Sequence, residues 1–223
     1  MFYLKLFYKT KDRKMRKKTF KLVSSDQERF IWLEGVINRQ TAGEFIKQLT
    51  KLNNDGSDPI FLYVSGPGGL LDSCLDMIIA INNSKSKVLC VAHGEVASSS
   101  FVLTQAATIG FRLAIAGTKF KFHRALYKYK LAVSIKAGTS ISQEDYLDRL
   151  KILTKFDGVI LAMFFLKCKP NRRMEIIELQ QAEEILSVKR AISLGIMDNY
   201  FDKKDFSKDR KIAKALIKQR KSS

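Results

Sequence analysis

The sequence predicts an α/β fold built on a mostly parallel sheet, with one long helix in its C-terminal half. Segments typical of strands alternate with segments of helical periodicity between residues 29 and 122, and residues 143–168 have the pattern of a single long helix. Strands that alternate with helices are joined by crossover connections, so neighbouring strands run in the same direction. With 223 residues, 46% of them hydrophobic, the chain is long enough for one domain with extensions.

The first expected strand is residues 29–37 (RFIWLEGVI), because large apolar residues dominate it. A helix follows over about 41–52. Thr41 and Glu44 form a capping-box pattern at its start, and apolar residues then recur at helical spacing. The remaining expected elements are a strand at 60–64, a helix at about 70–82, a strand at 87–92, a helix beginning near Ser98, strands at 108–114 and 119–122, the long helix at 143–168 and a short helix at about 189–194.

Two glycine-bearing turns follow expected strands and lie at one edge of the sheet. Pro67-Gly68-Gly69 comes after the strand at 60–64, and Gly94 comes after the strand at 87–92. Ligands of parallel sheets bind beyond the carboxyl ends of the strands. A backbone without Cβ atoms can approach a substrate closely and point an N–H at a developing oxyanion, although an ordinary turn that needs positive φ explains the same glycines.

A serine triplet and two histidines supply the candidate side chains. Ser98 to Ser100 begin a helix directly after a strand, where a hydroxyl lies at the positive end of the helix. The alternative interpretation is a serine-rich N-cap. His123 ends the strand-like run at 119–122, whereas we expect His93 to be a packed residue at a strand end. A nucleophile, a base and exposed backbone N–H groups are the parts of a serine hydrolase.

Charge divides the chain into a folded part and two basic ends. Lysine and arginine outnumber aspartate and glutamate by 40 to 22, which gives a net charge of +18. We expect a basic N-terminal arm at residues 1–24, a folded domain at 25–202 and a basic C-terminal tail at 203–223. Such charge is also compatible with nucleic acid or an anionic membrane surface. No nucleic-acid recognition module is recognisable, so a nucleic-acid partner is not expected.

The cysteines and the apolar segments indicate a cellular setting. Cys74, Cys90 and Cys168 are widely spaced and show no metal-ligand pattern, so we expect buried, reduced thiols and no metal site. No apolar stretch reaches the roughly 18 residues of a membrane span, and the N-terminus has no apolar signal segment. A cytoplasmic location is expected, with an organelle interior left open.

Five segments, in this order and spacing, resemble the Clp protease proteolytic subunit (ClpP) family, which has the ClpP/crotonase fold of repeated β-β-α units. They are residues 28–37 (ERFIWLEGVI), 61–69 (FLYVSGPGG), 94–98 (GEVAS), His123 and 191–198 (AISLGIMD). They are similar to the family's opening strand, its Ser-Pro-Gly-Gly turn, its Gly-x-Ala-Ala-Ser nucleophile segment, its base and its closing signature. The resemblance covers residues 28–198, within the domain expected at 25–202.

The resemblance implies a serine endopeptidase that acts on polypeptides without a metal or a cofactor. Ser98 is then the nucleophile and His123 the general base, while the N–H groups of Gly68 and Ser99 form the oxyanion hole. Glu183 occupies the position of the family's catalytic aspartate, where a carboxylate orients the imidazole and stabilises the imidazolium. The family habit further implies a homo-oligomeric ring and an AAA+ unfoldase (Clp ATPase) as a possible partner.

Departures from the family pattern leave a second interpretation open. Glutamate replaces the aspartate at 183, and Arg124-Ala125 follows the histidine in place of Gln-Pro. Residues 126–133 (LYKYKLAV) replace a glycine-rich segment that binds substrate in the family. The alternative is a catalytically degenerate ClpP-like structural subunit of a mixed protease complex.

Overall fold

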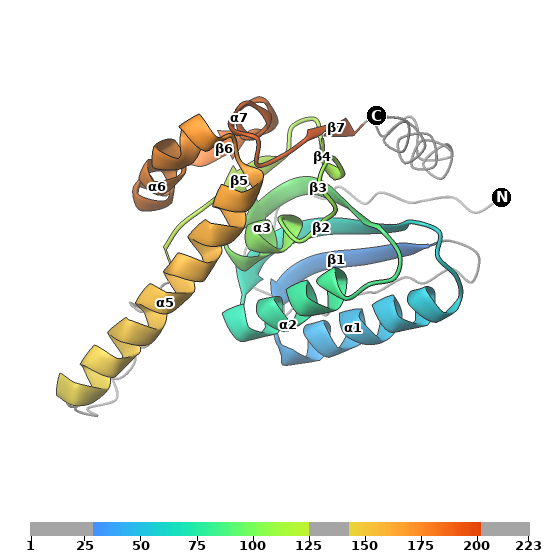
Figure 1. Cartoon of the computed structure of the whole chain (residues 1–223), viewed down its shortest axis with the longest axis horizontal. Coiled ribbons are helices and arrows are strands. Elements are labelled where there is room, and N and C mark those ends of the chain that lie inside the picture. Colours follow the sequence, from blue (N-terminus) through green and yellow to red (C-terminus); the bar gives the residue numbers. More distant parts are fainter. Residues whose placement is uncertain (1–28, 125–142, 202–223) are drawn as a thin grey trace, which may run out of the picture.

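The computed structural model describes residues 29–124 and 143–201, and these form an α/β fold around a seven-stranded sheet. The expected basic arm at 1–24, the tail at 203–223 and the segment at 126–133 lie outside the described residues. The main run of the sheet has the order β1-β2-β3-β4-β7 (Figure 1). Its strands are β1 (Phe30–Ile37), β2 (Ile60–Gly69), β3 (Val88–Ala97), β4 (Arg112–Ile115) and β7 (Asn199–Phe201).

Strand β3 changes its neighbour halfway along its length. Its first half pairs with β4, and its second half pairs with β5 (Lys119–Lys121), which in turn pairs with β6 (Ile185–Ser187). All of these pairings are parallel except that of β5 with β6. The predicted mostly parallel sheet is therefore confirmed. The end of β3 lies beside β5 and no longer beside β4.

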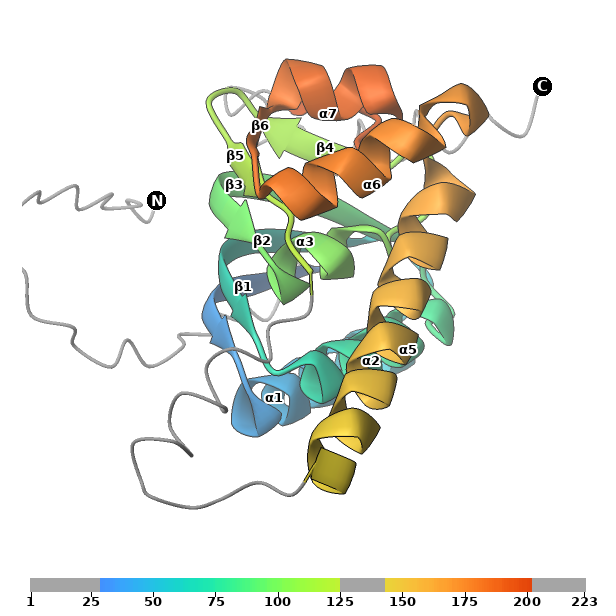
Figure 2. The same ribbon diagram turned by 90° about the vertical axis from the view of Figure 1, so that its left-hand side faces the viewer.

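Helices cover the sheet in two groups. Helices α1 (Arg39–Asn54) and α2 (Leu71–Asn82) lie together along one side of the sheet, and the short α3 (Ser99–Thr104) follows β3 (Figure 1). The long helix α5 (Gln143–Lys167) runs beside α3, while α6 (Arg173–Ala182) and α7 (Val188–Leu194) lie near β5 and β6 (Figure 2). A 3₁₀ turn, Pro170–Arg172, joins α5 to α6. The single long helix predicted at 143–168 is confirmed.

The first helix begins earlier than the sequence predicted. We expected Thr41 and Glu44 to form the capping box, but Asn38 is the N-cap. The Asn38 side chain accepts a hydrogen bond from the Thr41 N–H, and the Thr41 hydroxyl accepts one from the Asn38 N–H. Asparagine is as good an N-cap as serine or threonine, so Asn38 can cap the helix. Thr41 then occupies the third helical position of the capping box.

The expected turn at Pro67-Gly68-Gly69 is part of strand β2. The strand continues to Gly69, and the ladder with β1 pairs Val36 with Gly68 and Ile37 with Gly69 after a register shift. A Cβ at Gly69 would lie 2.0 Å from the carbonyl oxygen of Ile37. Gly69 is therefore needed for close strand pairing, and the segment is not a strand-to-helix turn.

Other boundaries differ where the local signal is short. The strand predicted at 108–114 begins only at Arg112, and the strand predicted at 87–92 continues to Ala97. Helix α6, strand β6 and strand β7 were not predicted. Each of these two strands has three residues, too few for an alternating pattern to be recognised.

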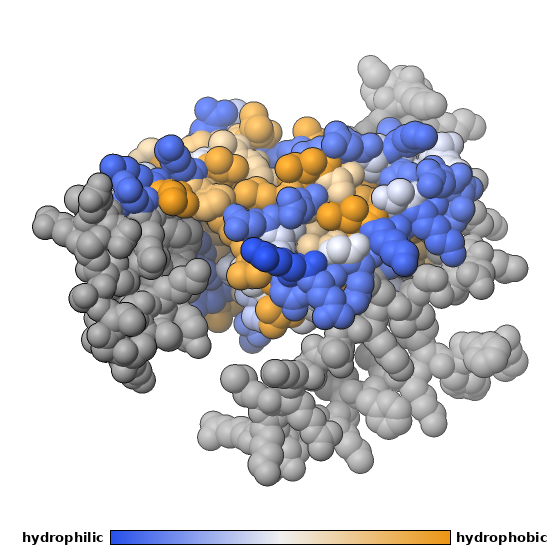
Figure 3. Space-filling model, turned by 90° about the horizontal axis from the view of Figure 1, so that it is seen from below, coloured by the Kyte–Doolittle hydropathy of each residue, from blue (hydrophilic) through white to orange (hydrophobic). Residues whose placement is uncertain are grey.

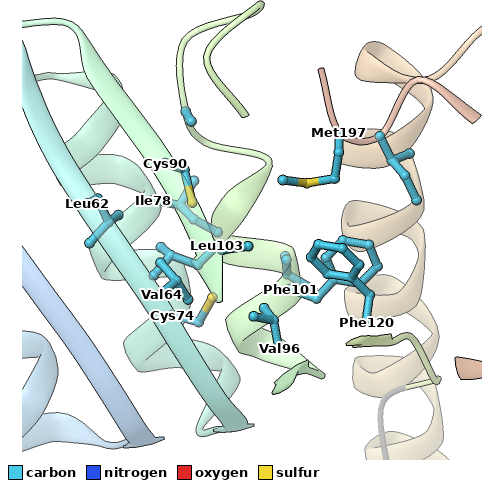
Figure 4. Close-up of a cluster of buried hydrophobic side chains, with 14 of the residues drawn as sticks. Leu62, Val64, Cys74, Ile78, Cys90, Val96, Phe101, Leu103, Phe120 and Met197 are labelled. Carbon is cyan, nitrogen blue, oxygen red and sulfur yellow. The ribbon is translucent and has the colours of Figure 1, made fainter. Parts of the chain in front are cut away.

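The main core lies between the sheet and the helices α1, α2, α3 and α5. Figure 4 shows side chains from β2, β3, α2 and α3 meeting in this layer, with Phe101 and Phe120 beside each other near Met197. The rings of Phe101 and Phe120 have centroids 4.8 Å apart. The three cysteines are free and buried, as predicted, and burial raises the pKa of the Cys74 thiol to about 12. That thiol is therefore protonated at neutral pH.

A buried ion pair fixes the C-terminal part of the domain to the sheet. Arg112, with only 2% of its side chain exposed, donates to both carboxylate oxygens of Asp198 at 2.6 and 3.1 Å. A third contact joins Arg112 to the side chain of Gln105, which itself donates to the carbonyl of Ile196. Asp198 and Ile196 belong to the closing segment at 191–198, so this network holds that segment against β4 and α3.

Among the described residues, no helix combines the length and the apolar character needed to cross a lipid bilayer.

We predict that Asp198→Ala lowers the free energy of unfolding by about 3 kcal/mol, because it leaves the buried Arg112 charge without a counter-ion. Urea denaturation followed by circular dichroism measures this change. Asp76→Ala is the matched control, since Asp76 is exposed on α2. Equal stability of the two variants would contradict the assigned role of the ion pair.

Candidate active site

Ser98 lies at the junction of β3 and α3 in a backbone conformation that is unusual for serine. Its φ is +53° and its ψ is −131°, and its side chain makes no capping hydrogen bond to the helix. The backbone is held on both sides. The Ser98 N–H donates to the carbonyl of Lys121, and the Ser98 carbonyl accepts from the N–H groups of Phe101 and Val102. A non-glycine residue held at positive φ marks a position at which the surrounding structure imposes strain, which is common at functional sites.

The three serines of the triplet have different surroundings. Ser99 and Ser100 are buried, whereas Ser98 is partly exposed. The Ser99 hydroxyl donates to the carbonyl of Gly69 at 3.3 Å, and the Ser99 carbonyl accepts from the Cys74 thiol at 3.2 Å. The Ser99 side chain thus joins α3 to the glycine segment. Of the three hydroxyls, that of Ser98 is the accessible one.

Gly68 lies directly against the Ser98 junction. A Cβ added at Gly68 would lie 2.7 Å from the Cβ of Ser98 and 2.8 Å from the backbone nitrogen of Ser99. Gly68 also has a φ of +91°. The Ser99 N–H belongs to the first turn of α3, where backbone donors have no partner within the helix. The structure therefore brings together Gly68, Ser98 and Ser99, as the sequence predicted.

His123 follows β5 at the same edge of the sheet. In the parallel ladder Ala97 is opposite Lys121, so Ser98 and His123 each come shortly after a paired position on adjacent strands. Parallel neighbouring strands lie about 4.8 Å apart. The His123 Nδ1 is 2.7 Å from the carbonyl oxygen of Arg124. A carbonyl only accepts, so this contact places the proton on Nδ1 and leaves Nε2 as the acceptor.

Glu183 lies near His123 in register, but its carboxylate points to another partner. Lys121 pairs with Ile185 in the antiparallel β5–β6 ladder, and continuing that ladder by two residues puts Glu183 opposite His123. Glu183 ends α6 in the left-handed region at φ +55°, and its carboxylate is 3.4 Å from the Lys121 ammonium. Since His123 Nδ1 contacts Arg124, the structure does not show a hydrogen bond between Glu183 and the imidazole.

His93 is a packed residue within β3, as predicted. Its ring meets Trp32 edge-on at 5.9 Å between centroids, and its Nε2 is 3.5 Å from a carboxylate oxygen of Glu34. These contacts direct it toward β1, away from β5. His123 is therefore the histidine positioned beside Ser98.

Sequence reasoning missed a buried carboxylate close to this edge. Asp157 of α5 is buried, and one of its carboxylate oxygens is 3.2 Å from the Nε of Arg124, the residue after His123. One signal in the sequence marks it. Asp157 is the one charged residue in the apolar stretch at 156–166 (FDGVILAMFFL), and a charge in such a stretch is uncommon unless it is paired.

Within residues 29–124 and 143–201, no three histidine, cysteine, aspartate or glutamate side chains converge in a way that would hold a metal ion.

Comparison with known proteins finds one family. The Clp protease family profile matches residues 14–204. The chain is 28% identical over 181 residues to the ATP-dependent Clp protease proteolytic subunit of Carsonella ruddii, covering 80% of this chain and 86% of that relative. The protein of the same name from Dehalococcoides mccartyi is also 28% identical over 181 residues, covering 79% of this chain and 84% of that relative. Subunit 3 of Synechococcus sp. (strain CC9605) is 32% identical over 100 residues, which are 44% of this chain and 50% of that relative.

We predict that Gly68→Ala destabilises the fold more than Gly117→Ala does. Both glycines have positive φ, at +91° and +85°, so both substitutions carry a backbone strain of about 1–3 kcal/mol. A Cβ at Gly117 meets open space, whereas one at Gly68 overlaps Ser98. Overpacking adds about 1–3 kcal/mol for Gly68→Ala alone. Urea unfolding of the two variants measures the difference, and equal losses would show that Gly68 does not abut the serine.

Proposed function

The chain belongs to the Clp protease family, and we propose that it is a serine-type endopeptidase that cleaves polypeptides through an acyl-enzyme on Ser98. The observation that carries this proposal is the Ser98 junction, where a partly exposed hydroxyl on a strained backbone abuts Gly68 and the Ser99 N–H. His123 follows the strand next to it. Buried thiols leave serine as the nucleophile at this edge.

The proposed reaction uses these groups in two steps. His123 Nε2 accepts the Ser98 hydroxyl proton while Oγ attacks the peptide carbonyl, and the N–H groups of Gly68 and Ser99 bind the resulting oxyanion. The imidazolium then returns the proton to the leaving amine as the C–N bond breaks. In the second step water, deprotonated by His123, hydrolyses the ester and restores the hydroxyl. No metal or cofactor takes part in this scheme.

The role of Glu183 as the third member of the triad stays a prediction. The β5–β6 register supports it, because continuing the ladder by two residues beyond the pair of Lys121 with Ile185 would bring Glu183 opposite His123. Its carboxylate must leave Lys121 to reach the imidazole. Since both partners of that ion pair are well exposed, the pair is weak and its loss costs little.

A ring of identical subunits that works with a Clp ATPase is the assembly we propose for this activity. The names of the relatives include "ATP-dependent" and "proteolytic subunit". The described surface supports an assembly, because several large apolar side chains are about half exposed or more, among them Leu166, Met174 and Ile185. The face in Figure 3 likewise shows apolar side chains interspersed with polar ones. A cytoplasmic or organelle-interior setting stays a prediction.

A structural, catalytically degenerate subunit is the second candidate function. One observation favours it: the Glu183 carboxylate contacts Lys121, while His123 Nδ1 contacts a backbone carbonyl. A chain of this kind keeps the fold and the ring contacts but does not react at Ser98.

We predict that a fluorophosphonate labels the wild-type chain at Ser98 and that Ser98→Ala abolishes the labelling. The reagent needs the nucleophile, the base and the oxyanion hole together. Ser100→Ala is the matched control, because Ser100 lies in the same triplet but is buried. Mass spectrometry of the labelled peptide identifies the modified residue. A folded wild-type chain without labelling would favour the structural subunit.

We predict that the purified chain elutes as an oligomer whose mass is a multiple of 25.4 kDa. Apolar side chains exposed on one copy are then buried between copies. Light scattering coupled to gel filtration measures the mass at several protein concentrations. A monomer at all of them would contradict the proposed homo-oligomeric ring.

A further inference from the structure

Both chain neighbours of His123 are attached to the long helix α5. The ring of Phe122 packs on Phe164 with centroids 4.4 Å apart, and both rings are almost completely buried. On the other side, Arg124 Nε is 3.2 Å from a carboxylate oxygen of Asp157. Asp157 and Phe164 are seven residues apart in α5, so they lie on the same face of the helix. The histidine is therefore held between two contacts to one rigid element.

The contact that orients the imidazole is a backbone carbonyl. His123 Nδ1 is 2.7 Å from the carbonyl oxygen of Arg124, and the N–H donates in this pair. In a Ser-His-acid triad a carboxylate accepts from Nδ1 and keeps the tautomer whose Nε2 takes the serine proton. A backbone carbonyl accepts the same hydrogen bond and selects the same tautomer. It does so without a negative charge.

We propose that Asp157 is a positioning residue for His123 and acts through Arg124. The ion pair fixes Arg124, and the Arg124 carbonyl then performs the orienting task that the resemblance assigns to Glu183. This inference rests on the proposed function, because it concerns the base that serves Ser98. Asp157 does not touch the imidazole.

Burial distinguishes the two carboxylates. The Asp157 side chain is 11% exposed and that of Glu183 is 48% exposed. The Asp157 carboxylate is shielded from water where it pairs with Arg124, whereas the pair of Glu183 with Lys121 competes with water. A glutamate in a left-handed C-cap also has more rotamers to restrict than an aspartate in a packed helix. The Arg124 carbonyl already contacts His123 Nδ1, so no side chain has to move for the histidine to be oriented.

The test measures the rate of fluorophosphonate labelling and, with a short fluorogenic peptide, kcat and KM for the full chain. Asp157→Asn removes the negative charge, and with it the ion pair, while the size and shape of the side chain stay the same. We expect it to lower the labelling rate and kcat by about 10- to 100-fold with KM little changed, because displacing a catalytic group by about 1 Å has an effect of this order. Asp157→Glu keeps the charge and should restore part of the rate.

A mutant cycle separates positioning from a merely structural effect. Arg124→Ala keeps the backbone carbonyl but removes the ion pair, and Arg124 is exposed, so this variant is expected to fold. If the two residues act through one contact, the double variant should lose no more rate than either single variant. Asp148→Asn is the matched control, because Asp148 is an exposed partner of Lys151 on the same helix.

The outcomes distinguish this inference from the proposed function. A wild-type chain that does not label at Ser98 would overturn both. Normal wild-type labelling together with unchanged rates in Asp157→Asn and Arg124→Ala would overturn the inference alone. So would additive losses in the mutant cycle. If Asp157→Asn does not fold, the Arg124→Ala rate decides in the same way.

Discussion

The close approach of the glycine segment to its neighbours is the constraint on which the rest of the site depends. At Gly66 and Gly69 the backbone of β2 meets the carbonyl groups of β1 so closely that a Cβ would lie about 2 Å from an oxygen. At Gly68 the same strand meets the Ser98 junction. The C-terminal stretch of β2 therefore contacts both β1 and Ser98, the residue that follows β3. A side chain at Gly66, Gly68 or Gly69 would separate elements whose contact positions the Ser98 hydroxyl and the Ser99 N–H.

Long-range contacts hold the other half of the site. The β3–β5 ladder continues to the end of β3, where the Ser98 N–H donates to Lys121, so the serine and histidine strands are held in register. The closing segment is attached by the buried Arg112–Asp198 pair. Helix α5 adds the aromatic contact between Phe122 and Phe164. The histidine side of the site thus depends on packing between elements far apart in sequence, and the serine side depends on the contact of β2 with the Ser98 junction.

The sequence predicted the serine side well because its signals are local. Glycines after an apolar strand, and serines where a strand becomes a helix, restrict the backbone within a few residues. Parallel strands then bring such segments to one edge. The errors occurred where a local pattern has two solutions. Asparagine at position 38 and threonine at position 41 both suit a cap, and the glycines at 68 and 69 suit either a turn or a strand in close pairing.

The orientation of His123 could not be predicted because it depends on which of several carboxylates reaches it in space. Sequence spacing identifies Glu183, and the β5–β6 register agrees with it. Spacing does not show that Lys121, on the same strand as the histidine, pairs with that glutamate. Nor does spacing show that helix α5 brings Asp157 to Arg124. A carboxylate that is close in register orients an imidazole only when its side chain turns toward Nδ1, and in the structure the Glu183 side chain pairs with Lys121. In physical terms, the question at His123 is whether a charged carboxylate or a neutral carbonyl accepts the hydrogen bond from Nδ1.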